Sequence, residues 1–168
     1  MPMDTSKSDD VPLSGGAIAV HSADSTVIND LVVNTIDRVA TLLKEGNREE
    51  AKRLITQVDG VVELAPDSPA PIQLIGVLVR LCKLSIACGE PKKATDLLAQ
   101  ISRYNDLSDP SSSETTGDYC TIGQVFMDNG YRPEARLAFE RALSILATRE
   151  DKEAAIYLAR VRTVLNTL

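Results

Sequence analysis

The sequence predicts an all-α protein: a right-handed stack of about seven helices, made of three helical hairpins and a C-terminal capping helix. The first observation behind this prediction is a phrase that occurs three times, in which a Gly stands five places before an Ala. Its copies begin at Gly46, Gly89 and Gly130, at steps of 89 − 46 = 43 and 130 − 89 = 41 residues. A Gly can end one helix in the left-handed conformation, and a small Ala lets the next helix approach closely. Each copy therefore marks the turn of one hairpin.

The second observation is the composition, which suits a helical core. The chain has 168 residues, of which 43% are hydrophobic and only 4% aromatic, and it contains no Trp. A chain of this length can bury a core without metals or disulfides, and this core must be mainly aliphatic. The three Cys form no C-x-x-C pair, so we expect reduced thiols.

The start of the chain differs from the rest in composition. Residues 1–24 mix Ser, Asp, Gly and Pro with a single apolar island at residues 17–20. They cannot bury enough apolar surface to offset the entropy cost of ordering. The sequence therefore predicts a disordered N-terminal arm over 1–24 and one helical repeat domain over 25–168.

Apolar residues at three- and four-residue steps predict the first three helices. The first begins near Ser25, which can act as its N-cap, and ends at Gly46. A second helix is predicted over 47–64, after which a Pro-containing segment breaks the pattern. The third, over 71–89, is apolar on most sides and is expected to be the most buried element.

Four further helices complete the predicted stack. The fourth follows Pro91 and ends near residue 104, and the polar, Ser-rich stretch 105–116 is predicted to be a loop. Helices five and six are predicted over 117–128 and 133–148. The seventh, over 151–165, is expected to cap the stack. Its residues expected to face inward are Ala155, Leu158, Ala159 and Val161.

These hairpins resemble the tetratricopeptide repeat. The resemblance is strongest in the third unit, which matches the motif through Tyr119, Ile122, Gly123, Phe126, Gly130, Tyr131, Ala135, Phe139 and Ala142. The second unit matches with a Cys at the small position of its first helix, and the first unit matches at fewer positions. The resemblance covers about residues 26–148, at a period longer than the family's usual 34 residues. It implies stacked hairpins whose first helices line a concave groove, whereas the alternative is a generic helical bundle.

The sequence offers little for catalysis or metal binding. Its only His, His21, lies in the predicted arm, which cannot hold a general base beside a nucleophile. Three scattered Cys with one remote His do not make a zinc site, and the carboxylates of 105–118 do not follow the calcium-loop pattern. We therefore expect no enzyme, no cofactor and no metal.

Charge and hydropathy bear on partners and location. The formal net charge is −6 at pH 7, which disfavours electrostatic binding to nucleic acid or anionic lipid. No run of 18 uncharged apolar residues occurs, and the N-terminus lacks the pattern of a signal peptide. These features predict a cytoplasmic protein that binds neither nucleic acid nor membrane.

The family resemblance implies a binding function, with a protein or peptide segment docked in the concave groove. The residues expected to contact this partner are Ile36, Leu43, Val79, Lys83, Ile86, Gln124 and Met127, and Cys120 falls at a further groove position. The Lys, Arg and Asn clamp with which some members of the family hold acidic tails is absent. Three alternatives stay open: a dedicated chaperone similar to class II chaperones of type III secretion, a self-assembling subunit that forms a homo-oligomer, and a groove filled by the arm, the cap or a second copy.

Overall fold

The computed structural model describes residues 25–58, 72–108 and 113–168. In these ranges the chain forms seven helices and no strand, which confirms the predicted all-α class. The predicted arm over 1–24 lies outside the described residues. The helices are α1 (Ser25–Lys44), α2 (Arg48–Gln57), α3 (Ile72–Ala87), α4 (Pro91–Ser108), α5 (Ser113–Asp128), α6 (Arg132–Leu146) and α7 (Lys152–Thr167).

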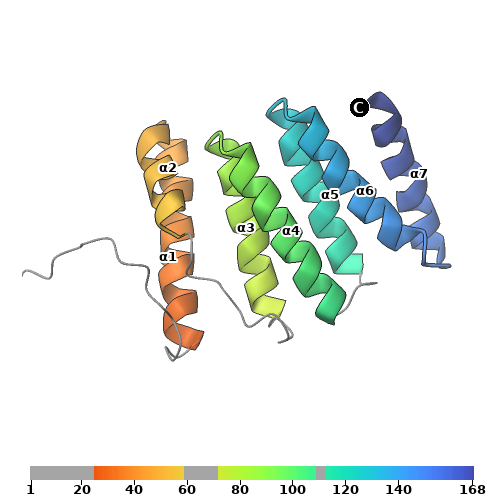
Figure 1. Ribbon diagram of the computed structural model, residues 1–168, viewed down its shortest axis with the longest axis horizontal. Coiled ribbons are helices and arrows are strands. Elements are labelled where there is room, and N and C mark those ends of the chain that lie inside the picture. The colour runs from red at the N-terminus through yellow and green to blue at the C-terminus, as the bar shows by residue number, and fades with distance from the viewer. Residues whose placement is uncertain (1–24, 59–71, 109–112) are drawn as a thin grey trace, which may run out of the picture.

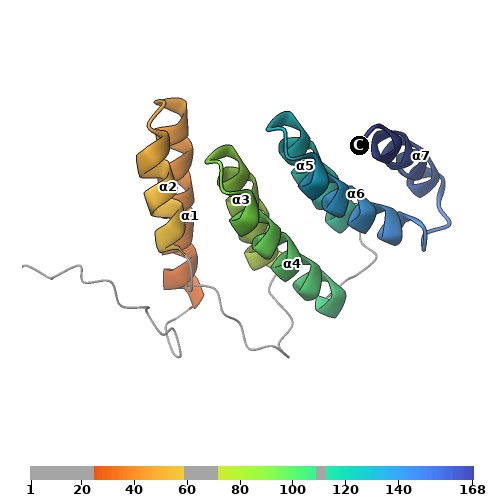
Figure 2. The same ribbon diagram turned by 45° about the horizontal axis from the view of Figure 1, so that its top comes forward.

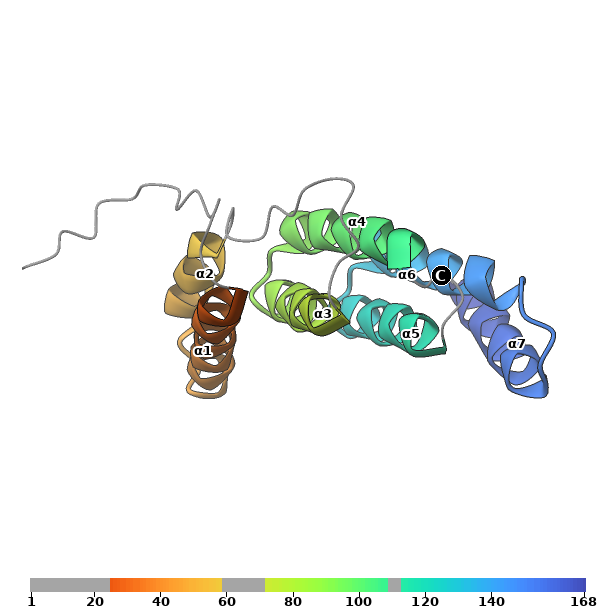
Figure 3. The ribbon, with the colours of Figure 1, turned by 90° about the horizontal axis from the view of Figure 1, so that it is seen from below.

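The helices are arranged in two layers (Figures 1 and 3). Helices α1, α3 and α5 lie in one layer, and α2, α4 and α6 lie in the other. Consecutive helices pair as antiparallel hairpins, and these pairs make the most extensive contacts between helices. Successive hairpins meet mainly through their first helices, α1 against α3 and α3 against α5. Helix α7 packs against α6 at the C-terminal end of the stack (Figure 2).

The three hairpins turn on the same backbone motif. Gly46, Gly89 and Gly130 have φ angles of 78°, 83° and 83°, a region that a residue with a Cβ adopts only with strain. The Gly130 N–H donates to the carbonyl of Met127 at 2.9 Å, and the next N–H along the chain donates to the carbonyl of Phe126 at 2.9 Å. The other two turns have the same pair of bonds. These bonds satisfy carbonyls that the end of a helix leaves unpaired, so the predicted glycine turns are confirmed.

The alanine of each recurring phrase lies at a helix contact, as predicted. Ala51, Ala94 and Ala135 are fully buried in the second helices of the three hairpins. In the second hairpin the approach is close enough for the Cys82 thiol to donate to the Ala94 carbonyl, at an Sγ to O distance of 3.3 Å. A side chain larger than Ala would force these helices apart.

A second contact within the third hairpin pairs a small residue with a larger one, and the equivalent positions of the other two hairpins carry different residues. In the third hairpin a Cβ added to Gly123 would lie 2.8 to 3.0 Å from atoms of the Phe139 ring, so only glycine fits under this ring. From the third hairpin to the second and then the first, the residue at the Gly123 position becomes larger, from Gly to Cys to Val. The residue at the Phe139 position becomes smaller, from Phe to Leu to Ile. The corresponding pairs are Cys82 with Leu98 in the second hairpin and Val39 with Ile55 in the first.

A polar cluster joins the second hairpin to the third. The Tyr119 hydroxyl on α5 is fully buried and lies 3.0 Å from the Ser102 hydroxyl and 3.3 Å from the Asn105 amide nitrogen, both on α4. Beside it, Arg141 on α6 forms an ion pair with Asp106 on α4. A buried hydroxyl without partners would be costly, so these bonds specify how the two hairpins meet.

The predicted loop over 105–116 is wrong at both of its ends. Helix α4 continues through Ser108, and α5 already begins at Ser113. The cause is tertiary packing, because Asn105 at one end and Thr115 and Thr116 at the other are buried. From the local sequence alone, these polar residues are expected to be exposed. At the predicted second helix, α2 ends at Gln57, and residues 59–64 lie outside the described residues.

The predicted inner face of the last helix is shifted by one residue at its start. Ala154, rather than Ala155, is buried, and Ala159 is exposed. Val161 is buried and Leu158 is half-buried, as predicted. Residues 154, 158, 161 and 165 follow the four- and three-residue steps of one helix face, so the correction moves the contact stripe without changing the capping position of α7.

Candidate functional site

Three of the seven residues predicted to contact a partner are buried in the core. Ile36, Val79 and Ile86 have exposed fractions of 1%, 4% and 0%. They lie on α1 and α3, where neighbouring first helices pack against each other. The expectation that these side chains face an open groove is therefore wrong, because the seams between successive first helices are closed.

The other four predicted residues reach the surface but do not meet in one cavity. Leu43, Lys83 and Met127 are half-buried, and Gln124 is exposed. The Gln124 amide donates to the Asp128 carboxylate at 2.8 Å along α5. These residues are distributed over α1, α3 and α5, so they form no single site on their own.

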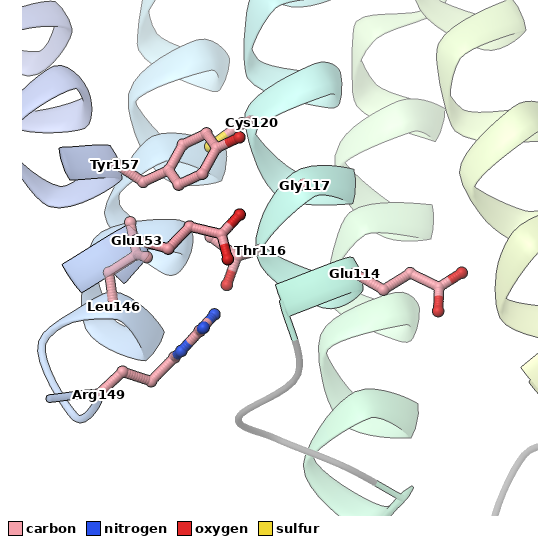
Figure 4. A pocket seen from close by; sticks show the side chains of 8 residues that line it. All are labelled: Glu114, Thr116, Gly117, Cys120, Leu146, Arg149, Glu153 and Tyr157. Atoms are coloured by element: carbon pink, nitrogen blue, oxygen red, sulfur yellow. The ribbon is translucent and has the colours of Figure 1, made fainter. Parts of the chain in front are cut away.

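A cavity of about 300 Å³ instead lies between α5 and α7 (Figure 4). Helix α7 packs on α6 but makes little contact with α5, which leaves a gap between the two. This gap, which we call the α5/α7 pocket, is lined by Glu114, Thr116, Gly117, Cys120, Leu146, Arg149, Glu153 and Tyr157. Of these eight residues, Cys120 stands at a groove position that the family resemblance indicates, and Gly117 stands at a position of the clamp that this chain lacks.

The walls of the pocket are mainly apolar. The Tyr157 ring, 43% exposed, points from α7 toward Cys120 on α5 (Figure 4). Leu146, at the end of α6, is almost fully buried and contributes to the lining. Gly117 leaves open space on the α5 side, because a Cβ added there would meet nothing within 4 Å. The pocket therefore has the size and surface to take one apolar side chain.

The cation of the pocket already has a partner. The Arg149 Nε donates to the Asp151 carboxylate at 2.8 Å. Asp151 is also the N-cap of α7, accepting from the Ala154 N–H at 2.8 Å, and this bond, followed by Arg149, holds the pKa of the carboxyl below its usual range. Unlike Arg149, the two acids of the pocket are unpaired, because among the described residues neither Glu114 nor Glu153 forms an ion pair. The excess charge at the pocket is therefore negative.

The chemistry of these residues suits binding. Burial raises the pKa of the Cys120 thiol, so this side chain is a protonated, weakly polar group at neutral pH and a poor nucleophile. Within the part of the chain that the structure describes, no three His, Cys, Asp or Glu side chains gather to hold a metal ion.

Comparisons with protein-family models, with curated proteins and with solved structures find no match to this chain. The resemblance to the tetratricopeptide repeat therefore stays a prediction from the residues. Among the seven described helices, none combines the length and apolar character that a membrane span requires.

Sequence reasoning missed most of the pocket. Four of its residues line it only because α7 packs against α6 and makes little contact with α5: Leu146, Arg149, Glu153 and Tyr157. The one available signal was Tyr157 itself, an aromatic side chain outside the stripe with which α7 packs on the stack. An aromatic residue in such a place indicates an exposed apolar surface.

Proposed function

We propose that the protein is a noncatalytic interaction module that holds a segment of a partner protein in the α5/α7 pocket. The observation that carries this proposal is the gap itself. The two earlier seams of the same layer bury Ile36, Val79 and Ile86, whereas this one leaves a cavity of about 300 Å³ with an exposed aromatic wall. Such pockets hold the anchor residues of protein interfaces.

The energetics favour an apolar anchor in this pocket. A side chain that enters it leaves water and covers the exposed Tyr157 ring. Full burial of a Leu, Met or Phe side chain contributes about 1.5 to 3 kcal/mol. Tyrosine gives this contact at a low entropy cost, because it has only two side-chain torsions. The rest of the segment would lie along the exposed and half-buried residues of α5, including Gln124 and Met127.

A matched pair of glycines tests the proposal. Gly117 and Gly76 both stand 13 residues before their turn glycines (130 − 117 = 89 − 76 = 13), both are exposed, and neither has an atom within 4 Å of an added Cβ. Both sites therefore accept a Cβ without a clash, and removal of a helical glycine stabilises the helix by about 0.5 to 1 kcal/mol. Only Gly117→Leu fills the pocket.

We would immobilise wild type, Gly117→Leu and Gly76→Leu and quantify the proteins that each retains from native lysate. We expect wild type and Gly76→Leu to retain the same partner and Gly117→Leu to lose it, with melting temperatures of both variants at or above that of wild type. Equal retention of every partner by the two variants would contradict a role for the pocket.

Self-assembly is a second candidate, favoured by one observation. Ile156, on the outer face of α7, is 56% exposed at the open end of the stack. If this face joins two copies, light scattering on wild type should show a dimer, and Ile156→Glu should give a monomer. A monomeric wild type rules this candidate out. In either case we propose a cytoplasmic location, where the three free cysteines would stay reduced.

A further inference from the structure

We infer that the partner segment carries a Lys or Arg side chain directly beside the apolar side chain that enters the α5/α7 pocket. This inference rests on the proposed function, and it names the chemistry of the partner. Its basis is the distribution of charge around an otherwise apolar cavity, because an interface of this kind is selected by complementary charges at its rim.

The pocket carries two carboxylates without an ion pair among the described residues. Figure 4 shows the Glu153 carboxylate directed toward Thr116, whereas the Glu114 side chain points away from Tyr157, to the opposite side of α5. Both glutamates lie in the first turn of their helices. The one cation of the lining, Arg149, is compensated by Asp151 at 2.8 Å. A cation supplied by the partner could therefore pair with Glu153 without breaking an ion pair among the described residues.

The neighbouring residues on α5 extend this negative region. Asp118 lies one helical turn beyond Glu114 and is half-buried. Burial raises the pKa of the Asp118 carboxyl, and Glu114 raises it further, while Lys83 on α3 acts in the opposite direction. Negative charges are thus crowded along the first two turns of α5.

Just outside the pocket, beside Tyr157, the charge has the other sign, which orients the segment. The Arg160 guanidinium lies over the Tyr157 ring, 5.8 Å from its centroid. Arg160 is seven residues beyond Glu153 on the same helix, which corresponds to about 10 Å of rise. A basic side chain of the partner would therefore lie toward the first turn of α7, and its apolar neighbour would contact Tyr157 and Cys120.

A library of random 12-residue peptides displayed on phage gives a defined probe. The library is selected on wild-type protein after removal of all phage that bind Gly117→Leu, and the enriched peptides are sequenced. We expect an apolar residue adjacent to Lys or Arg in most of them. Failure to enrich any peptide that distinguishes wild type from Gly117→Leu overturns the proposed function together with this inference. Enrichment of pocket-dependent peptides that are neutral or acidic overturns the inference alone.

Two glutamate variants then test the charge directly with one enriched synthetic peptide. Glu153→Gln removes the carboxylate directed toward Thr116 at constant size, and Glu150→Gln removes an exposed carboxylate three residues away, outside the lining. We expect about fivefold weaker binding for Glu153→Gln, from loss of one partly screened ion pair, and unchanged binding for Glu150→Gln. Equal affinities of the two variants, with both still blocked by Gly117→Leu, would overturn the inference.

Discussion

The seam between α3 and α5 and the gap between α5 and α7 occupy equivalent places in one layer, yet only the first is closed. Val79 and Ile86 on α3 stand 10 and 3 residues before their turn glycine, and both are buried. Cys120 and Met127 stand at the same distances from the turn of the third hairpin, and both are only half-buried. The difference lies in the next helix, because α5 packs against α3 whereas α7 packs against α6. The same position of a hairpin is thus core or binding surface depending on its neighbour.

An introduced charge should give the largest difference in stability between the seam and the gap. Ile86→Glu places a carboxylate at a fully buried position, and we expect it to lose about 3 to 5 kcal/mol of stability or to unfold, because the charge has no partner there. Met127→Glu, at the equivalent half-buried position, should cost much less because its carboxylate can reach water. Denaturation followed by circular dichroism measures both. Equal midpoints for the two variants would show that the seam and the gap do not differ.

A methyl group should distinguish a closed contact from an open position in the same layer. Gly123→Ala places a Cβ within 3 Å of the Phe139 ring, and we expect a loss of about 1 to 3 kcal/mol. Gly76→Ala, where the added atom meets nothing, should instead gain about 0.5 to 1 kcal/mol.

The double variant Gly123→Ala with Phe139→Leu imitates the smaller partner found in the second hairpin, so its loss should be less than the sum of the two single losses. Strict additivity would mean that the two positions are not coupled.

The hairpins could be predicted from the sequence because their signals are local. A glycine that needs positive φ and an alanine five residues later describe a turn and a close contact within a few residues, as at Gly130 and Ala135. The polar residues Thr115 and Thr116 could not be assigned in this way, since only packing against other helices buries them. The pocket depends on the angle at which α7 meets α6, and no short pattern around Tyr157 encodes this angle.

The smallest expected effect is a pH-dependent change in stability from Asp118, which lies on α5 near Lys83 of α3. The folded-state pKa of Asp118 is raised, mainly by burial, so the folded protein binds this proton more tightly than the unfolded chain. Its stabilising contribution is complete below the unfolded pKa of about 3.9 and is lost as the pH rises through the folded pKa. Asp118→Asn should therefore slightly raise the melting temperature at pH 7 and leave it unchanged near pH 3. A lower melting temperature at pH 7 would mean that attraction to Lys83 outweighs burial.

The most direct measurement of the open gap is the rate at which each cysteine reacts with a thiol reagent, followed by mass spectrometry of the native protein. Burial raises the pKa of Cys82 to about 12 and raises the pKa of Cys88 and Cys120 as well, but only Cys120 lines the pocket. Because a thiol reacts as its thiolate and must be reached by the reagent, we expect the half-buried Cys120 to react first and the fully buried Cys82 at least tenfold more slowly. Gly117→Leu should slow Cys120, and Gly76→Leu should not. Reaction of Cys120 as slow as that of Cys82 would mean that the gap between α5 and α7 is closed.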